Sequence, residues 1–460
     1  MKGTEIMFLD ENYLLKGETA RELYKRVKDL PILDPHNHAN VREIAENRNY
    51  ANPWQLFAAT DHYVWEVLRK RSVPEKYLTG DASPKEKWMK MASVFPELAG
   101  NPVYEWIHLD MKRYLGIDDI LGPETGLKIW DSASEVLAGN DRKPQALLKQ
   151  IGVEVMCSTD DPCDLLEEHK VVNKSVGKTI LRPTWRPDKA MNIFSPNWRN
   201  YMVRLEERFG VKIKSVKDLV SVLRLSHHHF AENGCVASDH GVEVPYGGDA
   251  KIGDAEKVFK IALSGKQPTC GQCGIFMSYI LGEMAEMDSE KGWVFQLHIG
   301  AVRDIRKSLF ETLGPDTGGD VSNHHMDILA PLKKFLNRFD DRLKVTLYCL
   351  ESGHQATLAT VSRAFGAKVN LGSAWWLCDT PVGMRRQLEY IGSVDLFANF
   401  AGMVSDSRKL LSYGSRFEMF RRVFCDVIGE MVDYGQIPLP VAAKLAERVC
   451  YSGPKEFYNL

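Results

Sequence analysis

Long apolar runs and a one-sided charge are both missing from the 460 residues of this chain. No run approaches the ~20 consecutive apolar residues that a membrane-spanning helix needs. Residues 1–30 carry Lys16, Arg21 and Lys25 among acidic residues, where a signal peptide would have an apolar core. The 59 basic and 61 acidic residues give a formal net charge of -2 and are interleaved, without a basic stripe suited to nucleic acid. We therefore expect neither a membrane nor a nucleic acid as a partner.

Cysteines are few and show no pairing pattern. Nine of them, an odd number, are scattered from Cys157 to Cys450, which argues against a disulfide framework and favours a reducing, cytoplasmic location. Cys270 and Cys273 have the Cys-x-x-Cys spacing, but no second pair matches it, and a Gly- and Pro-containing loop explains the segment equally well. Three consecutive histidines at 227–229 point around a predicted helix, so we expect them at the surface.

Short runs rich in β-branched and apolar residues recur along the chain, most of them separated by amphipathic segments of helix length. Their near-continuous hydrophobicity suits strands buried on both faces, as in a parallel sheet. Eight such runs predict an α/β fold, a (β/α)8 TIM-like barrel that forms a single domain over residues 1–460. The runs are residues 30–34, 153–158, 179–184, 235–238, 293–297, 344–350, 368–372 and 396–404.

More than a hundred residues, 41–152, separate the first and second runs, far more than a simple crossover needs. The segment is mostly helical by pattern, for example over residues 61–71, 83–93 and 132–138, with turn signals between. We expect a helical insertion that caps the barrel mouth. Such a cap would exclude water from the chemistry and supply residues to the site.

Ionisable or aromatic residues follow most of the runs. Each can be explained as a solvated loop residue or a helix cap. Their recurrence at the carboxyl ends of successive strands favours an active site, because this end of a barrel carries the catalytic residues. They are Asp34, His36, His38, Asp160, Asp161, Arg186, Asp188, Asp239, His240, His298, Trp375, Trp376, Asp406 and Arg408.

A metal site is predicted at the end of the first strand. His36 and His38 are two residues apart, so their side chains emerge on the same side and can converge on one cation. Asp406, after the last run, neighbours the first strand once a barrel closes and supplies a carboxylate. His298 arrives from the opposite side, as a fourth ligand or as a hydrogen-bonding group for a substrate. We expect one divalent ion, Zn, Mn or Fe; the alternative is a set of satisfied polar residues in a barrel mouth.

Two arginines indicate an anionic substrate. Arg186 and Arg408 follow different strands and would present planar guanidinium groups to the same mouth. Salt bridges to Asp188 or Asp406 would explain them without any substrate. Tyr63, in the insertion, is a candidate acid or hydrogen-bond donor if the insertion closes over the barrel, and core packing is its alternative.

These strand-end residues resemble the pattern of the amidohydrolase superfamily: His-x-His after the first strand, His after the fifth or sixth, and Asp after the eighth. Hydrolytic members mostly add a Lys or a metal-bridging Glu after the fourth strand, where this chain has Asp239 and His240, which disfavours a dinuclear hydrolase. The finer resemblance is to the uronate isomerase (glucuronate isomerase) family. It runs through residues 34–38, 60–63, 100–109, 159–162, 184–188, 237–240, 297–300, 375–376, 406–408 and 420–422.

The resemblance implies an aldose–ketose isomerase of hexuronate catabolism, which interconverts D-glucuronate with D-fructuronate and D-galacturonate with D-tagaturonate. It implies that His36, His38 and Asp406 hold the metal. Substrate contacts are expected from Tyr63, Arg186 and Arg408, with His62, His298 and Trp375 as further substrate-binding candidates.

The chemistry of such an isomerase suits these residue types. Ring opening is followed by removal of the C2 proton, a stabilised cis-enediol and delivery of a proton to C1. We expect Asp406, alone or through a metal-bound water, to take the C2 proton, Arg408 and Tyr63 to stabilise the enediolate, and Arg186 to bind the carboxylate. The rivals are a mononuclear hydrolase and a sugar-acid-binding barrel without turnover. A homo-oligomer is expected only by analogy with other large barrel enzymes.

Overall fold

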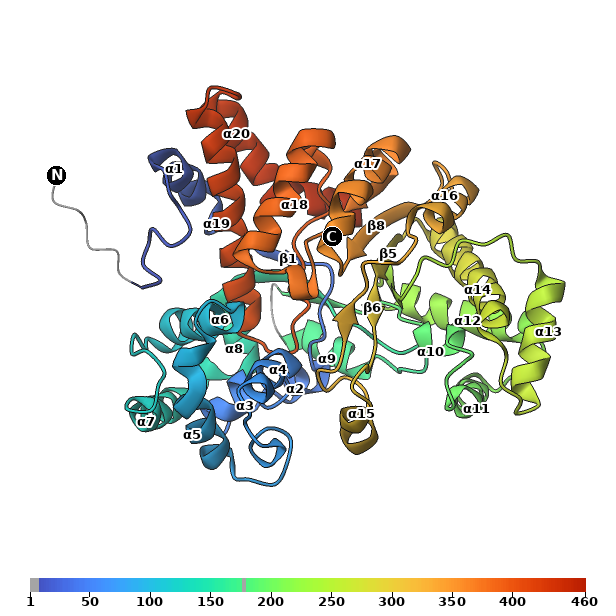
Figure 1. The fold of residues 1–460 in the computed structure, drawn as a ribbon, viewed down its shortest axis with the longest axis horizontal. Helices are drawn as coiled ribbons and strands as arrows, with labels where there is room; N and C mark the ends of the chain where they lie inside the picture. The colour runs from blue at the N-terminus through green and yellow to red at the C-terminus, as the bar shows by residue number, and fades with distance from the viewer. Residues whose placement is uncertain (1–7, 176–178) are drawn as a thin grey trace.

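The computed structural model describes residues 8–175 and 179–460. Residues 1–7, the start of the segment considered for a signal peptide, lie outside the described residues, as do residues 176–178. Strands lie in the interior, and helices surround them (Figure 1). Within the described ranges, no helix is both long and apolar enough to cross a bilayer.

Seven of the eight predicted runs contain a strand, and all seven strands pair in parallel. One sheet has the order β1 (Ile32–Asp34), β2 (Val153–Cys157), β3 (Ile180–Arg182). The other has the order β4 (Ala237–Val242), β5 (Val294–Ile299), β8 (Lys344–Cys349), β9 (Val369–Leu371). A short antiparallel pair, β6 (Ala301–Val302) and β7 (Val321–Ser322), was not predicted.

The prediction of an eighth strand over residues 396–404 is wrong. The segment begins with the 3-10 helix η8 (Phe397–Asn399) and continues as irregular chain, in which Gly402 has a φ of 115° that a strand does not allow. Hydrophobicity correctly indicated burial here, but it does not specify backbone conformation. The segment still runs between the two sheets, since Ala401 N donates to Leu371 O of β9 (2.8 Å) and Asp406 N donates to His36 O (3.2 Å).

The two sheets also meet on their other side. Trp185 forms isolated parallel bridges with Asp160 and with Ser238 of β4. Its backbone N donates to Ala237 O (3.3 Å), and its O accepts from Asp239 N (2.9 Å). The α/β class with parallel strands is therefore confirmed, although the described strands form two sheets and not one regular eight-stranded sheet.

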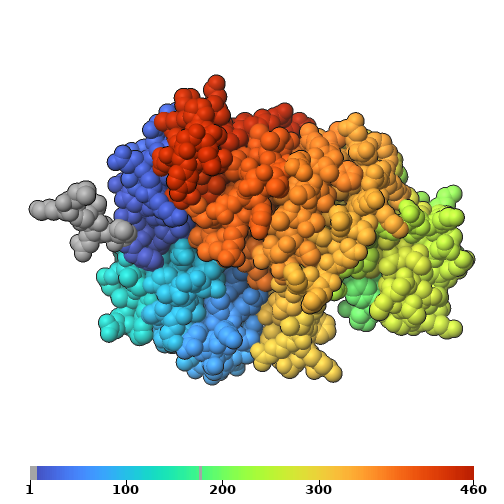
Figure 2. Space-filling view, turned by 45° about the horizontal axis from the view of Figure 1, so that its top comes forward, coloured from blue at the N-terminus to red at the C-terminus, as the bar shows by residue number. Residues whose placement is uncertain are grey.

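The helical prediction for residues 41–152 is confirmed, and Figure 2 shows this part (blue to cyan) as one continuous body beside the carboxyl-terminal helices. Side chains cap most of these helices: Asp61 accepts from Tyr63 N, and Ser83 forms a capping box with Glu86. The helices are α2 (Val41–Glu46), α3 (Pro53–Phe57), α4 (His62–Lys70), α5 (Pro84–Val94), α6 (Pro102–Asp110), α7 (Gly126–Leu137) and α8 (Pro144–Ile151). The 3-10 helices η1 (Glu75–Tyr77), η2 (Phe95–Leu98) and η4 (Asn140–Arg142) and the π-helix η3 (Met111–Leu115) lie among them.

The remaining helices cover the strands. The buried helix α19 (Ser412–Asp433) packs against both α1 (Glu18–Val27) and α6, and so joins the insertion to the rest of the molecule (Figure 1). The others are α9 (Glu167–Ser175), α10 (Asp188–Met191), α11 (Trp198–Phe209), α12 (Val216–Glu232), α13 (Ile252–Leu263), α14 (Cys270–Lys291), α15 (Lys307–Leu313), α16 (Leu329–Arg338), α17 (Gln355–Phe365), α18 (Pro381–Val394), α20 (Leu439–Glu447) and α21 (Gly453–Tyr458). Four further 3-10 helices and one π-helix complete the chain: η5 (Ser352–His354), η6 (Gly366–Lys368), η7 (Trp376–Cys378), η8 and η9 (Arg448–Ser452).

Two minor sequence expectations are corrected. Cys270 and Cys273 do not lie in a loop but in the first turn of α14, which Thr269 begins with a capping box. His227 is not at the surface: it is 2% exposed, its Nε2 lies 2.9 Å from Asp288 Oδ1, and its ring packs on Trp293. A buried carboxylate partner, invisible in the local sequence, makes burial of this imidazole favourable.

Gly372, directly after β9, is required by close packing. A Cβ at this position would lie 2.0 Å from the ring of Tyr348, whose hydroxyl donates to Gln296 Oε1 (3.0 Å). We predict that Gly372→Ala lowers stability by about 1–3 kcal/mol, because the buried ring cannot move aside without breaking its contacts. Thermal unfolding measures this change. In the control, Gly274→Ala in α14, a Cβ meets nothing within 4 Å, so stability should rise by up to about 1 kcal/mol. Equal Tm values for the two variants would contradict the argument.

Candidate active site

Asp406 is the point at which three separate parts of the chain meet. Its Oδ1 lies 3.2 Å from His36 Nε2 and 3.2 Å from His38 Nε2. Its Oδ2 accepts a hydrogen bond from the Tyr63 hydroxyl at 3.2 Å. The predicted grouping of two histidines and a carboxylate is thus present, and the insertion adds a phenol to it.

Backbone and side-chain hydrogen bonds hold the two strand-end segments together. Asp34 accepts from Ser405 N (2.9 Å) and Ser405 Oγ (2.6 Å), and His38 N donates to Ser407 O (3.0 Å). Asp406 itself has a φ of 47°, a left-handed conformation that is uncommon for a non-glycine residue. These contacts maintain that conformation and aim the Asp406 carboxylate at the histidines.

Asp239, on β4, forms a second centre beside the first. Its Oδ1 accepts from His298 Nδ1 (2.7 Å), and its Oδ2 accepts from Arg186 Nη1 (2.9 Å) and lies 3.5 Å from His36 Nδ1. Asp239 is fully buried. The sequence pattern drew attention to this residue but gave it no role; the structure brings it into contact with three predicted site residues.

The electrostatics favour ionised carboxylates and neutral His38 and His298, whereas Asp239 and Asp406 outweigh burial and raise the pKa of the shared His36. Burial disfavours the charge of Asp239 and Asp406, yet Arg186, His36 and His298 hold the pKa of Asp239 well below its usual range, and His36 and His38 do the same for Asp406. Burial lowers the pKa of His38 to about 4 and that of His298 to about 4, against the opposing effect of the carboxylates. Anionic carboxylates next to neutral imidazoles are the donor set that a divalent cation requires.

Two overlapping groups of donor atoms each lie within 4.8 Å of one another. One is His36, His38 and Asp406, the predicted ligand set, and the other is His36, Asp239 and His298. His36 belongs to both, because its two ring nitrogens face the two carboxylates. Among the described residues, the buried atoms His36 Nδ1 and His298 Nε2 have no hydrogen-bond partner, which fits nitrogen atoms reserved for a ligand.

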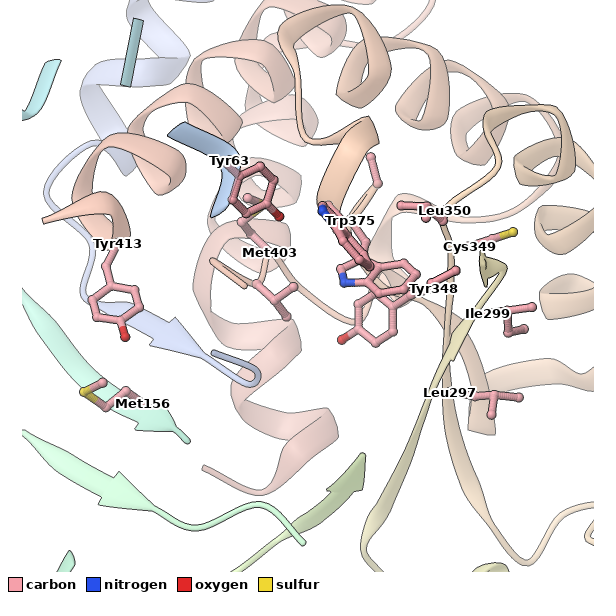
Figure 3. Packing of buried hydrophobic residues seen from close by; sticks show 14 of the residues in the cluster. Tyr63, Met156, Leu297, Ile299, Tyr348, Cys349, Leu350, Trp375, Met403 and Tyr413 are labelled. Atoms are coloured by element: carbon pink, nitrogen blue, oxygen red, sulfur yellow. The ribbon is translucent and has the colours of Figure 1, made fainter. Parts of the chain in front are cut away.

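Aromatic residues line the space next to these groups. Figure 3 shows the rings of Tyr63 and Trp375 on neighbouring sides of the same space, with Tyr348 beside Trp375. The His298 ring stacks on Tyr348 at 4.2 Å between centroids and lies 4.6 Å from Trp375. His62 stacks on Tyr63 at 4.7 Å. His62, His298 and Trp375, predicted to bind substrate, therefore border one region.

The two predicted arginines differ in their surroundings. Arg186 donates from Nε to Asp188 (2.9 Å) and from Nη1 to Asp239, so the salt bridge left open by the sequence is formed. Arg408 does not reach Asp406 within ion-pair distance among the described residues; its Nη2 lies 3.5 Å from Asp316 Oδ1. Burial raises the pKa of Asp316, but this effect is outweighed by the charges of Arg408, Arg303, His38 and His62, which lower it. The Arg408–Asp316 pair therefore lies near the histidines.

Sequence reasoning missed two charged residues next to Tyr63. The guanidinium of Arg416 is buried 4.7 Å from the Tyr63 ring centroid and donates from Nη1 to Ser405 O (2.6 Å). Asp379 is fully buried and accepts from Trp375 N (2.8 Å), which supports the positive φ of 68° at Trp375. Arg416 lies in a helix, Asp379 lies three residues after the Trp375–Trp376 pair, and no local pattern marks either of them.

Comparisons with known proteins agree along the whole chain. The family model for glucuronate isomerase matches residues 6–458. The uronate isomerase of Thermotoga sp. (strain RQ2) is 46% identical over 452 residues, which are 98% of this chain and 100% of that protein. The crystal structure of the Thermotoga maritima uronate isomerase has a TM-score of 0.97 at 46% identity, covering 98% of this chain and 100% of that one. That of the Caulobacter crescentus glucuronate isomerase has a TM-score of 0.94 at 28% identity, over 98% and 97% of the two chains.

These matches span the residues that form the site, and together with the α/β fold they define an enzyme of the isomerase class. The chain belongs to the uronate isomerase family. The resemblance drawn from its sequence motifs is thereby confirmed.

Asp379 generates a prediction about pH and stability. Burial raises the pKa of Asp379 to about 7, above the ordinary value, so the folded protein binds more protons than the unfolded chain between about pH 4 and 7. Its stabilising contribution is present at acid pH and is lost as the pH rises through 7. We predict that, after any bound metal has been removed with a chelator, Asp379→Asn is more stable than the parent at pH 8 by about 1–3 kcal/mol. The difference in stability should shrink toward pH 5.

The control has the opposite sign. Burial raises the pKa of Asp161, but the Lys189 charge and the hydrogen bond from Cys163 N outweigh this effect and hold the pKa below its ordinary value. Asp161→Asn should therefore lose stability at pH 8 and converge with the parent only in acid. Tm profiles from pH 5 to pH 8 that run parallel for Asp379→Asn and the parent would contradict the assignment.

Proposed function

We propose that the chain interconverts D-glucuronate with D-fructuronate and D-galacturonate with D-tagaturonate, by proton transfer through a cis-enediol, in hexuronate catabolism. The observation that carries the proposal is the Asp406 carboxylate, which faces His36 and His38 with one oxygen and Tyr63 with the other. Membership of the uronate isomerase family supports it. We further propose a cytoplasmic enzyme and, by analogy with other large barrel enzymes, a homo-oligomer.

We also propose that the two sheets and residues 400–407 close into one (β/α)8 barrel, a single domain over residues 1–460 of which residues 41–152 cover the mouth. The bridges at Trp185 on one side and the hydrogen bonds of Ala401 and Asp406 on the other support closure. The contact between Tyr63 and Asp406 supports the position of the insertion over the strand ends.

We infer that His36, His38 and Asp406 hold one divalent ion, Zn, Mn or Fe. The donor set suits these ions, and the neutral state of His38 at physiological pH favours binding. A bound ion would supply a Lewis acid that polarises a substrate oxygen. The remaining roles fall to residues of the chain itself.

Asp406 is the proposed base for the C2 proton. Hydrogen bonds and charges from His36 and His38 outweigh burial and hold the pKa of Asp406 well below the ordinary value, so the carboxylate is ionised at neutral pH. Burial and the charge of Asp406 keep the pKa of Tyr63 far above 10, so its hydroxyl stays protonated and can donate to an enediolate oxygen. The pair thus offers an acceptor and a donor 3.2 Å apart.

The arginines are proposed to bind the anionic groups of the substrate. Arg186 is fixed by Asp188 and Asp239 through Nε and Nη1, so its plane is set before a carboxylate arrives. Among the described residues, the single ion-pair partner of Arg408 is the half-exposed Asp316 at 3.5 Å, so the guanidinium can turn toward an enediolate. His62, His298 and Trp375 would border the sugar.

A time course by proton NMR in deuterated water, with D-glucuronate or D-galacturonate as substrate, tests the proposal. We expect ketose signals to appear and deuterium to enter at C2. If neither uronate changes with added divalent metal, the isomerase proposal fails, and turnover of amides, esters or lactones would favour the mononuclear hydrolase.

Asp406→Asn tests the base directly. We predict a fold that is retained and a kcat reduced by at least about 100-fold, the range lost with a general base. Asp254→Asn, which changes a half-exposed carboxylate of α13 paired with Lys257, is the control and should leave kcat within about twofold. Near-normal turnover by Asp406→Asn would refute its role.

Metal content tests the ligand set independently of turnover. We predict about one tightly bound divalent ion per chain by elemental analysis, and a loss of most of it in His36→Asn, since one of three protein ligands is removed. His228→Asn, an exposed histidine of α12, is the matched control. Full metal content in both variants would exclude His36 as a ligand.

A further inference from the structure

Lys409 is a buried cation that the proposed chemistry does not use. Its side chain is 2% exposed, and its Nζ lies 2.9 Å from Asp61 Oδ2, whose side chain is 4% exposed. A buried ammonium group is costly unless an opposite charge accompanies it. This pair joins the segment after Asp406 to the helical insertion, two regions more than three hundred residues apart in the sequence.

The carboxylate of Asp61 makes two different contacts, one with each oxygen. Asp61 is the N-cap of α4, and its Oδ1 accepts a hydrogen bond from Tyr63 N at 2.9 Å. Its other oxygen meets Lys409. Although burial opposes it, the Lys409 charge lowers the pKa of Asp61, so the carboxylate is ionised. One residue therefore fixes both the start of the helix that carries Tyr63 and the ammonium group.

A second carboxylate from the insertion faces the same cation. Asp110, at the end of α6, is fully buried, and neither of its oxygens accepts a hydrogen bond from another described residue. Burial raises the pKa of Asp110 to about 7, and the charge of Lys409 is the largest effect opposing this rise. The charge of Lys409 thus acts on carboxylates of two helices, α4 and α6, and it forms an ion pair with that of α4.

Two short chain segments, 61–63 and 406–409, contact each other at both ends. From Lys409 the chain leads back through Arg408 to Asp406. From Asp61 it leads forward through His62 to Tyr63. The two ends meet again where the Tyr63 hydroxyl donates to Asp406 Oδ2.

We propose that the buried Lys409–Asp61 ion pair is a positioning device for the isomerisation, which sets the Tyr63 hydroxyl against the Asp406 carboxylate. The inference rests on the proposed function, since it assumes that Asp406 and Tyr63 act on the substrate.

If the Lys409–Asp61 pair served folding alone, its removal would leave kcat unchanged. Replacing both members of a buried ion pair by neutral groups of similar size is often neutral or stabilising, whereas removal of one member leaves an uncompensated charge. The double variant Lys409→Met with Asp61→Asn removes both charges and keeps a good N-cap at position 61. It therefore separates positioning from stability.

The experiment compares this double variant with the parent protein in the NMR isomerase assay, with Tm and metal content measured alongside. We expect an unchanged or higher Tm, unchanged metal content, a KM within about threefold and a kcat reduced at least about 30-fold, because the acceptor and the donor are no longer held in register. Lys409→Arg, which keeps the cation, should recover part of kcat.

A matched control removes another ion pair that joins the insertion to α19. Arg113 of the π-helix η3 pairs with Glu418 at 2.8 Å, away from Tyr63 and Asp406. Arg113→Met with Glu418→Gln should leave kcat within about threefold. A kcat near that of the parent in the Lys409 double variant would overturn the proposal, and so would an equal loss in the Arg113 control. Absence of turnover in the parent protein would instead refute the proposed function.

Discussion

The Asp406 carboxylate is the constraint on which the rest of the site depends. It is buried, and burial disfavours its charge; His36 and His38 keep it ionised from one side, while Tyr63 donates from the other. To make these contacts, the first strand, the segment after Gly402 and the insertion must come together within a few ångströms. The unusual backbone conformation of Asp406 is maintained because so many contacts require it.

The alternation of β4 explains how one strand serves both the site and the core. Asp239 points inward to His298 and Arg186, while Ser238 and His240, on the opposite face, contact each other at 2.8 Å. Ser238 also donates to Asp288, which binds His227. The outward residues thus form a hydrogen-bonded network with helices α12 and α14, and they hold the strand that carries Asp239.

Features that leave a local pattern in the sequence could be predicted, and features defined by distant residues could not. Buried strands leave hydrophobic runs, and His36 and His38 share a side because of strand periodicity, so the parallel strands and the proximity of these two histidines were predictable. The irregular conformation of residues 396–404 was not predictable, since burial of Val404 is compatible both with a strand and with irregular chain stabilised by distant partners. Arg416 and Lys409 were missed for the same reason: each is defined by groups far away in the sequence, and neither helical periodicity nor loop composition marks a buried cation.

Charge balance argues for one metal ion and not two. The site holds two buried carboxylates, Asp239 and Asp406, with His36 between them. Arg186 already supplies a permanent cation to Asp239 at 2.9 Å, in contact with the oxygen that a second metal would need. Asp406 has no guanidinium within ion-pair distance among the described residues, so the proposed divalent ion would gain more there than beside Asp239.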